Sequence, residues 1–154
     1  MTPSEIRALV KRLDTASVRD REEVWEQLRT LGAAVAPYLA EAYPAFRKAQ
    51  GRVALVFYSL RYARMSEDVF RLGVQALSDK ATLVRYRACG LLAYSLRADA
   101  IPYLKTLLDH KDAPTVEDAR AAIDAISRKN HHYFMDREHS GRTFWQVNED
   151  EGPH

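Results

Sequence analysis

The stretch from Asp79 to Asp109 most constrains the fold of this chain, because it carries two apolar helical patterns separated by a short corner. In both halves apolar residues recur every three or four positions, which places them on one face of each helix. These positions are Val84, Ala88, Leu91, Leu92 and Leu96, then Ile101, Leu104, Leu107 and Leu108. Pro102 is tolerated only near a helix start, so the corner falls near residues 98–100.

Parts of this unit recur along the chain. The tetrapeptide at residues 58–61 returns at residues 94–97, and the Pro-Tyr-Leu sequence at residues 37–39 returns at residues 102–104. The first helices are predicted to start near Val18, Gly51, Leu83 and Val116. This spacing of roughly thirty residues is typical of helical solenoids. One helical pair cannot bury both of its apolar faces alone, so the pairs are expected to stack on one another.

The unit resembles a HEAT repeat. The resemblance is carried by Asp79, Val84-Arg85, Ala88, Leu91-Leu92 and Ile101-Pro102-Tyr103-Leu104. It implies an all-α fold, a short right-handed HEAT-like α-solenoid. In HEAT-like families the arginine after the valine often bonds aspartates of neighbouring loops between helices. The resemblance therefore implies a row made of Arg85, Arg120, Asp79 and Asp112, although the first two pairs lack a clean Asp and Val-Arg signature.

The two ends of the chain differ from the repeats. Within a helical domain at residues 1–130, a helix at residues 3–14 is expected to cap the N-terminal end. Residues 131–148 have aromatic and β-branched residues on either side of a Ser-Gly turn, which predicts a C-terminal β-hairpin. Trp145, with Phe134 or Phe144, is expected to cover the exposed end of the last repeat. Residues 149–154 are expected to fray.

Length and charge limit the classes of protein that this chain can belong to. Its 154 residues correspond to about one domain, which can bury a core without metals or disulfides. The single cysteine, Cys89, excludes an internal disulfide and indicates a reducing compartment. The N-terminus has no charged-then-apolar leader, and the apolar run at residues 53–58 is far too short to span a bilayer. We expect a cytoplasmic monomer that does not enter membranes.

The histidine-rich tail raises the question of a metal site. The candidate ligands are His131, His132 and His139, with Asp136 and Glu138 nearby. Adjacent strand residues point to opposite faces, so His131 and His132 are not expected to share one ion, and surface histidines are the favoured interpretation. Residues 136–141 also imitate the first half of a calcium loop, but Val147 stands where that loop needs a glutamate. We expect no metal and no cofactor.

No grouping of acid, base and nucleophile is apparent in the sequence, and no catalytic residue is predicted. Cys89 lies beside the apolar stripe of a predicted helix. A nucleophilic thiol needs a positioned base and partial exposure, so a buried small residue is the favoured interpretation of Cys89. The chain is therefore not expected to be an enzyme.

The return helices supply the candidate partner-binding residues, because such helices often line the concave surface of a solenoid. Aligning them makes Tyr38, Leu72 and Tyr103 equivalent, and tyrosine is a common interface anchor. The predicted binding residues are Tyr38, Arg71, Gln75 and Tyr103. The alternative, that these tyrosines pack between helices, stays open.

These observations favour a non-enzymatic protein-protein interaction module of the adaptor or immunity type. The tail, from His131-His132-Tyr133-Phe134 through Ser140-Gly141 to Trp145, is similar to that of small bacterial HEAT-like immunity or adaptor proteins, which implies a protein partner such as a toxin. The alternative is a nucleic-acid-binding protein related in fold to alkylpurine DNA glycosylases. The net charge of +2 and the dispersed arginines disfavour that alternative. Phycobilin lyases share the repeat as well.

Overall fold

The computed structural model of the chain describes residues 1–152, and this part contains helices but no strand. The α-helices are α1 (Pro3–Lys11), α2 (Val18–Leu28), α3 (Ala36–Ala42), α4 (Ala49–Leu60), α5 (Glu67–Ala76), α6 (Thr82–Ser95), α7 (Ile101–Lys105) and α8 (Ala113–Ser127). The 3-10 helices are η1 (Arg29–Val35), η2 (Tyr43–Ala45), η3 (Ala98–Ala100), η4 (His131–Phe134) and η5 (Glu149–Glu151). The all-α prediction is confirmed. Among residues 1–152, no helix has the length and apolar character needed to cross a membrane.

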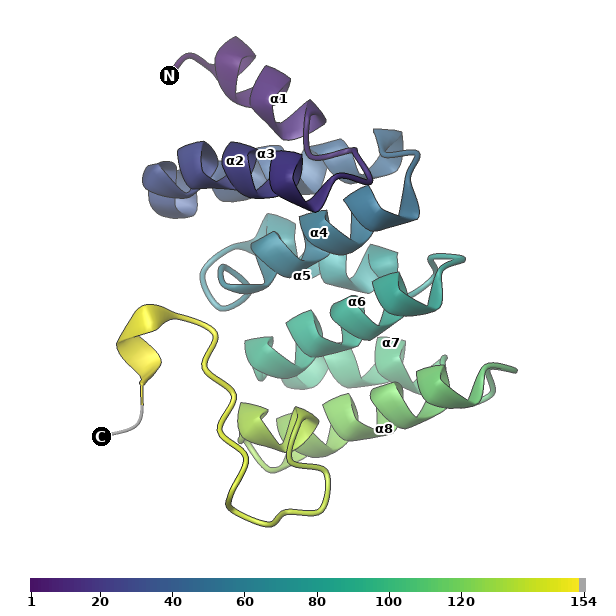
Figure 1. Cartoon of the computed structure of the whole chain (residues 1–154). Helices are drawn as coiled ribbons and strands as arrows, with labels where there is room; N and C mark the ends of the chain where they lie inside the picture. Colours follow the sequence, from purple (N-terminus) through teal and green to yellow (C-terminus); the bar gives the residue numbers. More distant parts are fainter. Residues whose placement is uncertain (153–154) are drawn as a thin grey trace.

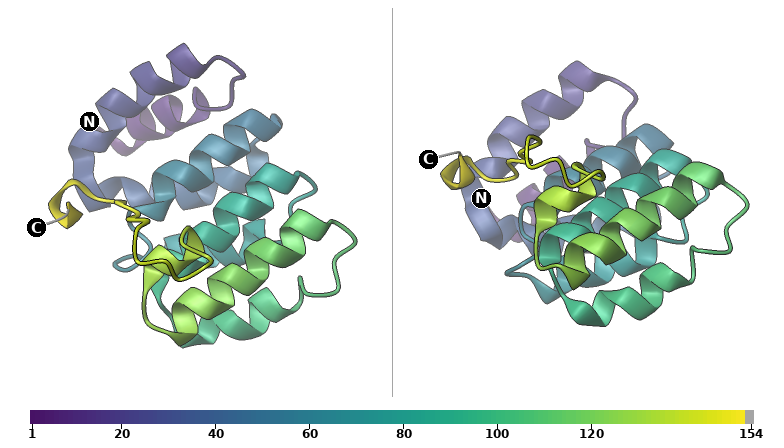
Figure 2. Two further views of the ribbon diagram at one scale, coloured as in Figure 1. Left: turned by 60° about the horizontal axis from the view of Figure 1, so that its bottom comes forward. Right: turned by 90° about the horizontal axis from the view of Figure 1, so that it is seen from below.

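The helices are stacked in sequence order from α1 to α8 (Figure 1). In this view α4, α6 and α8 form a front layer, and α5 and α7 lie behind it. Figure 2 turns the C-terminal end of the stack toward the viewer and shows the tail lying against the side of the helices. The molecule is thus built from layered helix pairs, with α1 alone at one end.

Side chains just before three of the helices fix where those helices begin. Thr2, Ser17 and Ser66 each accept a hydrogen bond from the backbone N–H three residues later, at 3.1, 3.1 and 3.2 Å. Each hydroxyl satisfies a backbone donor that has no partner within its helix. The chain therefore enters α1, α2 and α5 at defined positions.

One apolar core runs through the whole stack. Its fully buried large side chains include Leu13, Leu28, Leu39, Leu55, Leu72, Leu91, Leu92, Leu104 and Phe134. Helix α6 contacts α4, α5 and α8 and is buried around most of its circumference, as expected for a central helix. Helices α5 and α6 approach so closely that a Cβ on Gly73 would lie 2.6 Å from Cδ2 of Leu91.

The predicted β-hairpin at residues 131–148 is wrong. His131 to Phe134 form η4, and the chain then turns where the Asp136 carboxylate accepts the backbone N–H groups of Ser140 (3.0 Å) and Gly141 (2.8 Å). The backbone N–H of Trp145 donates to Nδ1 of His132 at 3.0 Å rather than to a second strand. Side chains thus take the donors that a hairpin ladder would have needed.

The tail packs on the last helices, where η4 contacts both α8 and α6. The ring of Phe134 packs against Gly90 of α6, where an added Cβ would lie 3.2 Å from Cε2 of Phe134. Its centroid is 5.6 Å from that of Trp145. Farther along, Asn148 donates its side-chain N–H to the carbonyl of Arg61, directly after α4, at 3.3 Å. The tail therefore contacts two neighbouring layers, both of which are far from it in the sequence.

The end of the tail is only partly described. Glu149 to Glu151 form η5, and Glu151 accepts a hydrogen bond from the hydroxyl of Tyr94 on α6. The prediction that residues 149–154 fray also covers residues 153 and 154, which lie outside the described residues.

We predict that Phe134→Ala destabilises the protein by about 3–5 kcal/mol, because it removes a buried ring from a filled site. Phe134 is 1% exposed, whereas Phe144 is 47% exposed and provides the matched control. Phe144→Ala should change the free energy of unfolding by less than about 1 kcal/mol. Urea unfolding measures both values, and equal effects of the two substitutions would contradict this packing of the tail.

Candidate partner-binding site

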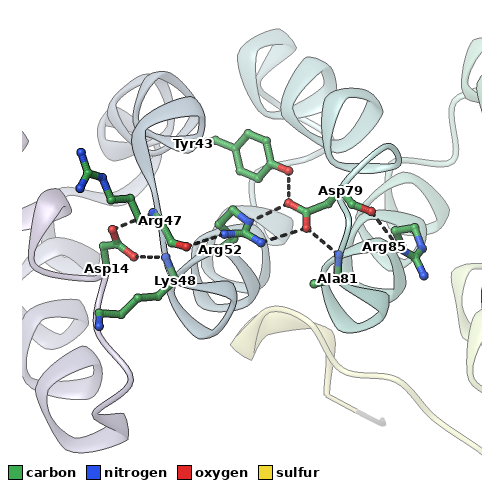
Figure 3. Close-up of polar contacts among 8 residues, drawn as sticks. All are labelled: Asp14, Tyr43, Arg47, Lys48, Arg52, Asp79, Ala81 and Arg85. Atoms are coloured by element: carbon green, nitrogen blue, oxygen red, sulfur yellow. Dashed lines mark hydrogen bonds and ion pairs between the residues drawn. The ribbon is translucent and has the colours of Figure 1, made fainter.

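A buried ion pair joins the second and third layers of the stack. Asp79, in the loop between α5 and α6, faces Arg52 of α4 (Figure 3). Nε of Arg52 donates to Oδ2 at 2.8 Å, and its terminal nitrogen donates to Oδ1 at 3.2 Å. The backbone N–H of Ala81 donates to Oδ1 at 2.9 Å, and the hydroxyl of Tyr43 donates to Oδ2. Asp79 thus ties three other segments together.

Both charged groups of this pair are almost completely shielded from solvent. The side chain of Arg52 is 8% exposed and that of Asp79 is 4% exposed. Burial disfavours ionisation of Asp79, but the hydrogen bonds from Arg52, Tyr43 and Ala81 outweigh it and leave the pKa of Asp79 below its ordinary value. Burial, followed by the hydrogen bond to Asp79, raises the pKa of Tyr43. Asp79 is therefore held as a carboxylate.

The same arrangement repeats one layer on. Arg85 of α6 pairs with Asp112 at 3.1 Å and also donates to the carbonyl of Asp79 at 2.8 Å. One layer earlier, Asp14 accepts the backbone N–H groups of Arg47 (2.9 Å) and Lys48 (3.0 Å). The structure therefore brings Asp79, Arg85 and Asp112 into one row.

Arg120 lies outside this row, contrary to the sequence interpretation. It is an exposed residue of α8 that pairs with Glu117 at 3.3 Å. Asp118 follows Arg85 by the same interval that separates Arg85 from Arg52, so Asp118 holds the equivalent position. Burial raises the pKa of Asp118, and the hydrogen bond from Arg137 of the tail, at 3.0 Å, opposes this rise. The last layer therefore takes its arginine from the tail.

The sequence interpretation missed Arg52 because Gly51 precedes it where a valine was expected. A Cβ on Gly51 would lie 2.7 Å from Oδ1 of Asp14, so a valine would not fit there without movement. The regular interval between Arg52, Arg85 and Asp118 is the signal that could have found this position.

Three of the four predicted binding residues line one hollow. Arg71 and Gln75 of α5 lie in it together with Tyr103 of α7, and its volume is about 340 Å³. Tyr103 is 49% exposed. Arg71 and Gln75 also line a neighbouring hollow of about 290 Å³, whose other side is formed by Pro37, Ala40 and Glu41 of α3. The exposed faces of α3, α5 and α7 thus form a continuous surface, called here the α3–α5–α7 surface.

Tyr38 does not share that hollow. It lines a separate pocket of about 530 Å³ between α1 and α3. There the guanidinium of Arg7 lies 5.2 Å from the centroid of the Tyr38 ring. Tyr38 thus lies beside α1, whereas its equivalent Tyr103 lies beside α5.

A charged network forms one side of the hollow. Arg97 pairs with Glu67 at 2.5 Å and with Asp99 at 2.6 Å. Its guanidinium lies 3.5 Å from the centroid of the buried Phe70 ring. Hydrogen bonds to Asp99 and Glu67 raise the pKa of Arg97. Positive and negative groups are therefore balanced beside Tyr103, and the network holds this side of the hollow in a defined shape.

The histidines of the tail are engaged with one another and with Trp145. The rings of His131 and His132 lie 4.0 Å apart, so the argument that they point to opposite faces is wrong. Burial lowers the pKa of His131, and its Nε2 lies 2.9 Å from the carbonyl oxygen of Trp145. Across residues 1–152, no three His, Cys, Asp or Glu side chains are grouped so that they could hold a metal ion. Through their contacts with Trp145, His131 and His132 stabilise the conformation of the tail.

Cys89 is buried in α6, and burial raises the pKa of its thiol. The reactive thiolate form is therefore strongly disfavoured at this position.

Comparison of the chain with protein-family models, with curated proteins and with solved structures finds no match in any of the three. The resemblance to HEAT repeats therefore stays a prediction that rests on the residues of this chain.

We predict that Asp79→Asn destabilises the protein by about 3 kcal/mol at pH 7, because it leaves the buried charge of Arg52 without a partner. The pKa of Asp79 is lowered in the folded state, so its contribution is complete above its ordinary value of 3.8 and is lost as the pH falls through the folded value. The stability difference between wild type and Asp79→Asn should therefore shrink below that pH. Unfolding by urea between pH 7 and pH 2.5 measures it.

The matched control is Asp109→Asn, which removes an exposed carboxylate. At pH 7 it should unfold within about 0.5 kcal/mol of the wild type. A difference between wild type and Asp79→Asn that stays constant or grows on acidification would contradict the ionised state assigned to Asp79.

Proposed function

We propose that the chain is a non-enzymatic protein-binding module of HEAT-like architecture, which binds its partner on the α3–α5–α7 surface. The observation that carries this proposal is the half-exposed ring of Tyr103, which stands beside a hollow shared with Arg71 and Gln75. Tyrosine and arginine are the residue types most often found as interface anchors. A surface of this kind suits one side chain inserted by a partner.

The shape and charge of the surface support a protein as the partner. Arg97 and Arg71 stand beside Glu67 and Asp99, so the hollow is not a positive groove of the kind that neutralises phosphates. The network formed by Arg97 exists before any partner binds, which reduces the entropy lost on association.

The immunity or adaptor role, with a toxin as one kind of partner, is proposed on the sequence resemblance of the tail. We also propose that the chain acts as a monomer in the cytoplasm. The buried free thiol of its single cysteine supports a reducing compartment.

The test is site-specific photo-crosslinking in the native host. A photoreactive residue in place of Tyr103 should give one discrete covalent adduct with another protein. The same residue in place of Leu83, an exposed apolar residue at the start of α6, should not give that adduct. Absence of an adduct from position 103, or the same adduct from both positions, would contradict the proposed surface.

Once the partner is purified, Tyr103→Ala combined with Gln75→Ala should weaken its binding about tenfold or more. Leu83→Ala should leave the affinity unchanged and serves as the control. If the partner is a toxin, co-expression of the wild-type chain should restore growth, and the double variant should restore it less well.

A further inference from the structure

The pocket between α1 and α3 lies at the N-terminal end of the stack and is separate from the α3–α5–α7 hollow around Tyr103. Val10 of α1 and Tyr38 of α3 contribute to its lining, and Phe46 follows at the end of η2. Ala42 and Ala45 also line it. Because these alanines are small and α1 has no return helix beside it, the space is left unfilled. Its volume of about 530 Å³ lies within the range of small-molecule sites.

The two acids that line this pocket already have partners. Glu41 pairs with Arg7 at 2.6 Å, and Asp14 accepts the backbone N–H groups of Arg47 and Lys48 at 2.9 and 3.0 Å. Both carboxylates are therefore engaged in holding the walls of the pocket together.

The other two cations of the lining, Lys11 and Arg47, differ from Arg7 because they form no ion pair in the described part of the chain. Lys11 and Arg47 both line the pocket and both are exposed. Within residues 1–152, Glu41 pairs with Arg7, and Asp14 accepts only backbone N–H groups, so neither acid pairs with the side chain of Lys11 or Arg47. The lining carries three cations and two carboxylates, so this apolar cavity has a net charge of one positive unit and suits a ligand that has an apolar body and one anionic end.

We propose that this pocket binds an amphipathic monocarboxylate of the medium-chain fatty acid class. The aliphatic chain lies against Val10, Tyr38 and Phe46, and the carboxylate lies between Lys11 and Arg47. A phosphate ester suits the site less well, because Asp14 and Glu41 are nearby and would repel a second negative charge. The ligand class follows from the apolar lining together with the two cations.

The test is a calorimetric titration of the full chain with sodium decanoate below its micelle concentration. We expect saturable binding with one site per chain. Amide shifts in a ¹⁵N spectrum should gather at Val10, Ala42 and Phe46. Lys11→Gln combined with Arg47→Gln should weaken binding about tenfold or more, because two charge-assisted contacts are lost. Decanol, which has the same chain without the charge, should bind wild type and this variant equally weakly.

Two further variants test whether decanoate binds in this pocket and not elsewhere on the surface. Lys105→Gln combined with Arg120→Gln removes the same charge from exposed positions elsewhere and should bind decanoate like the wild type. Ala45→Phe fills the pocket from its exposed edge and should abolish binding, while the melting temperature shows that the fold is kept.

Three outcomes would overturn the proposal. The first is the absence of saturable decanoate binding to the wild type. The second is equal affinity for decanoate in the wild type and in the Lys11→Gln, Arg47→Gln variant. The third is saturation of the pocket by an apolar peptide with a free C-terminus but not by decanoate, which would assign the pocket to a protein. None of these results depends on the partner expected at Tyr103.

Discussion

The ion pair between Arg52 and Asp79 is the interaction on which the order of the layers depends. Apolar burial drives the helices together, but it is not directional and tolerates small shifts between neighbouring layers. A bidentate pair inside that core accepts only one arrangement, because any shift would leave a buried charge without its partner. Tyr43 and the N–H of Ala81 complete the coordination of Asp79, so one carboxylate fixes η2, α4 and the start of α6.

The outermost helices are covered in different ways at the two ends of the stack. At the N-terminal end, Asp14 bonds the backbone ahead of α4, and the single helix α1 covers only part of α3, which leaves a pocket. At the C-terminal end, Asp118 stands where the inner layers have an arginine, and it receives Arg137 from the tail. The tail thus continues the row of ion pairs and also buries Phe134 against α6.

The sequence predicted the helical layers because apolar spacing is a local signal. It did not reveal Arg52, because Gly51 is required by the nearby Asp14, a contact between residues far apart in the chain. The tail was predicted as a hairpin from its composition, whereas the side chains of His132 and Asp136 take the backbone donors instead. Both features depend on tertiary contacts, which cannot be predicted from the secondary-structure propensities of single residues.

In the candidate site, too, the repeat pattern of the sequence does not reveal the tertiary surroundings of each residue. Arg71, Gln75 and Tyr103 share a hollow. Tyr38 is equivalent to Tyr103 in the repeat but lies beside α1, a helix with no counterpart in the third layer. Equivalent positions in a repeat therefore face different surroundings at the ends of a stack.

The central claim is that Arg52 and Asp79 act as one unit, and a double-mutant cycle tests it most directly. Arg52→Ala, Asp79→Ala and the double variant are each unfolded in urea at pH 7. Each single variant should lose about 3 kcal/mol or more, and the double variant should lose well under their sum, with a coupling energy of about 2 kcal/mol or more. Strictly additive losses would contradict the claim.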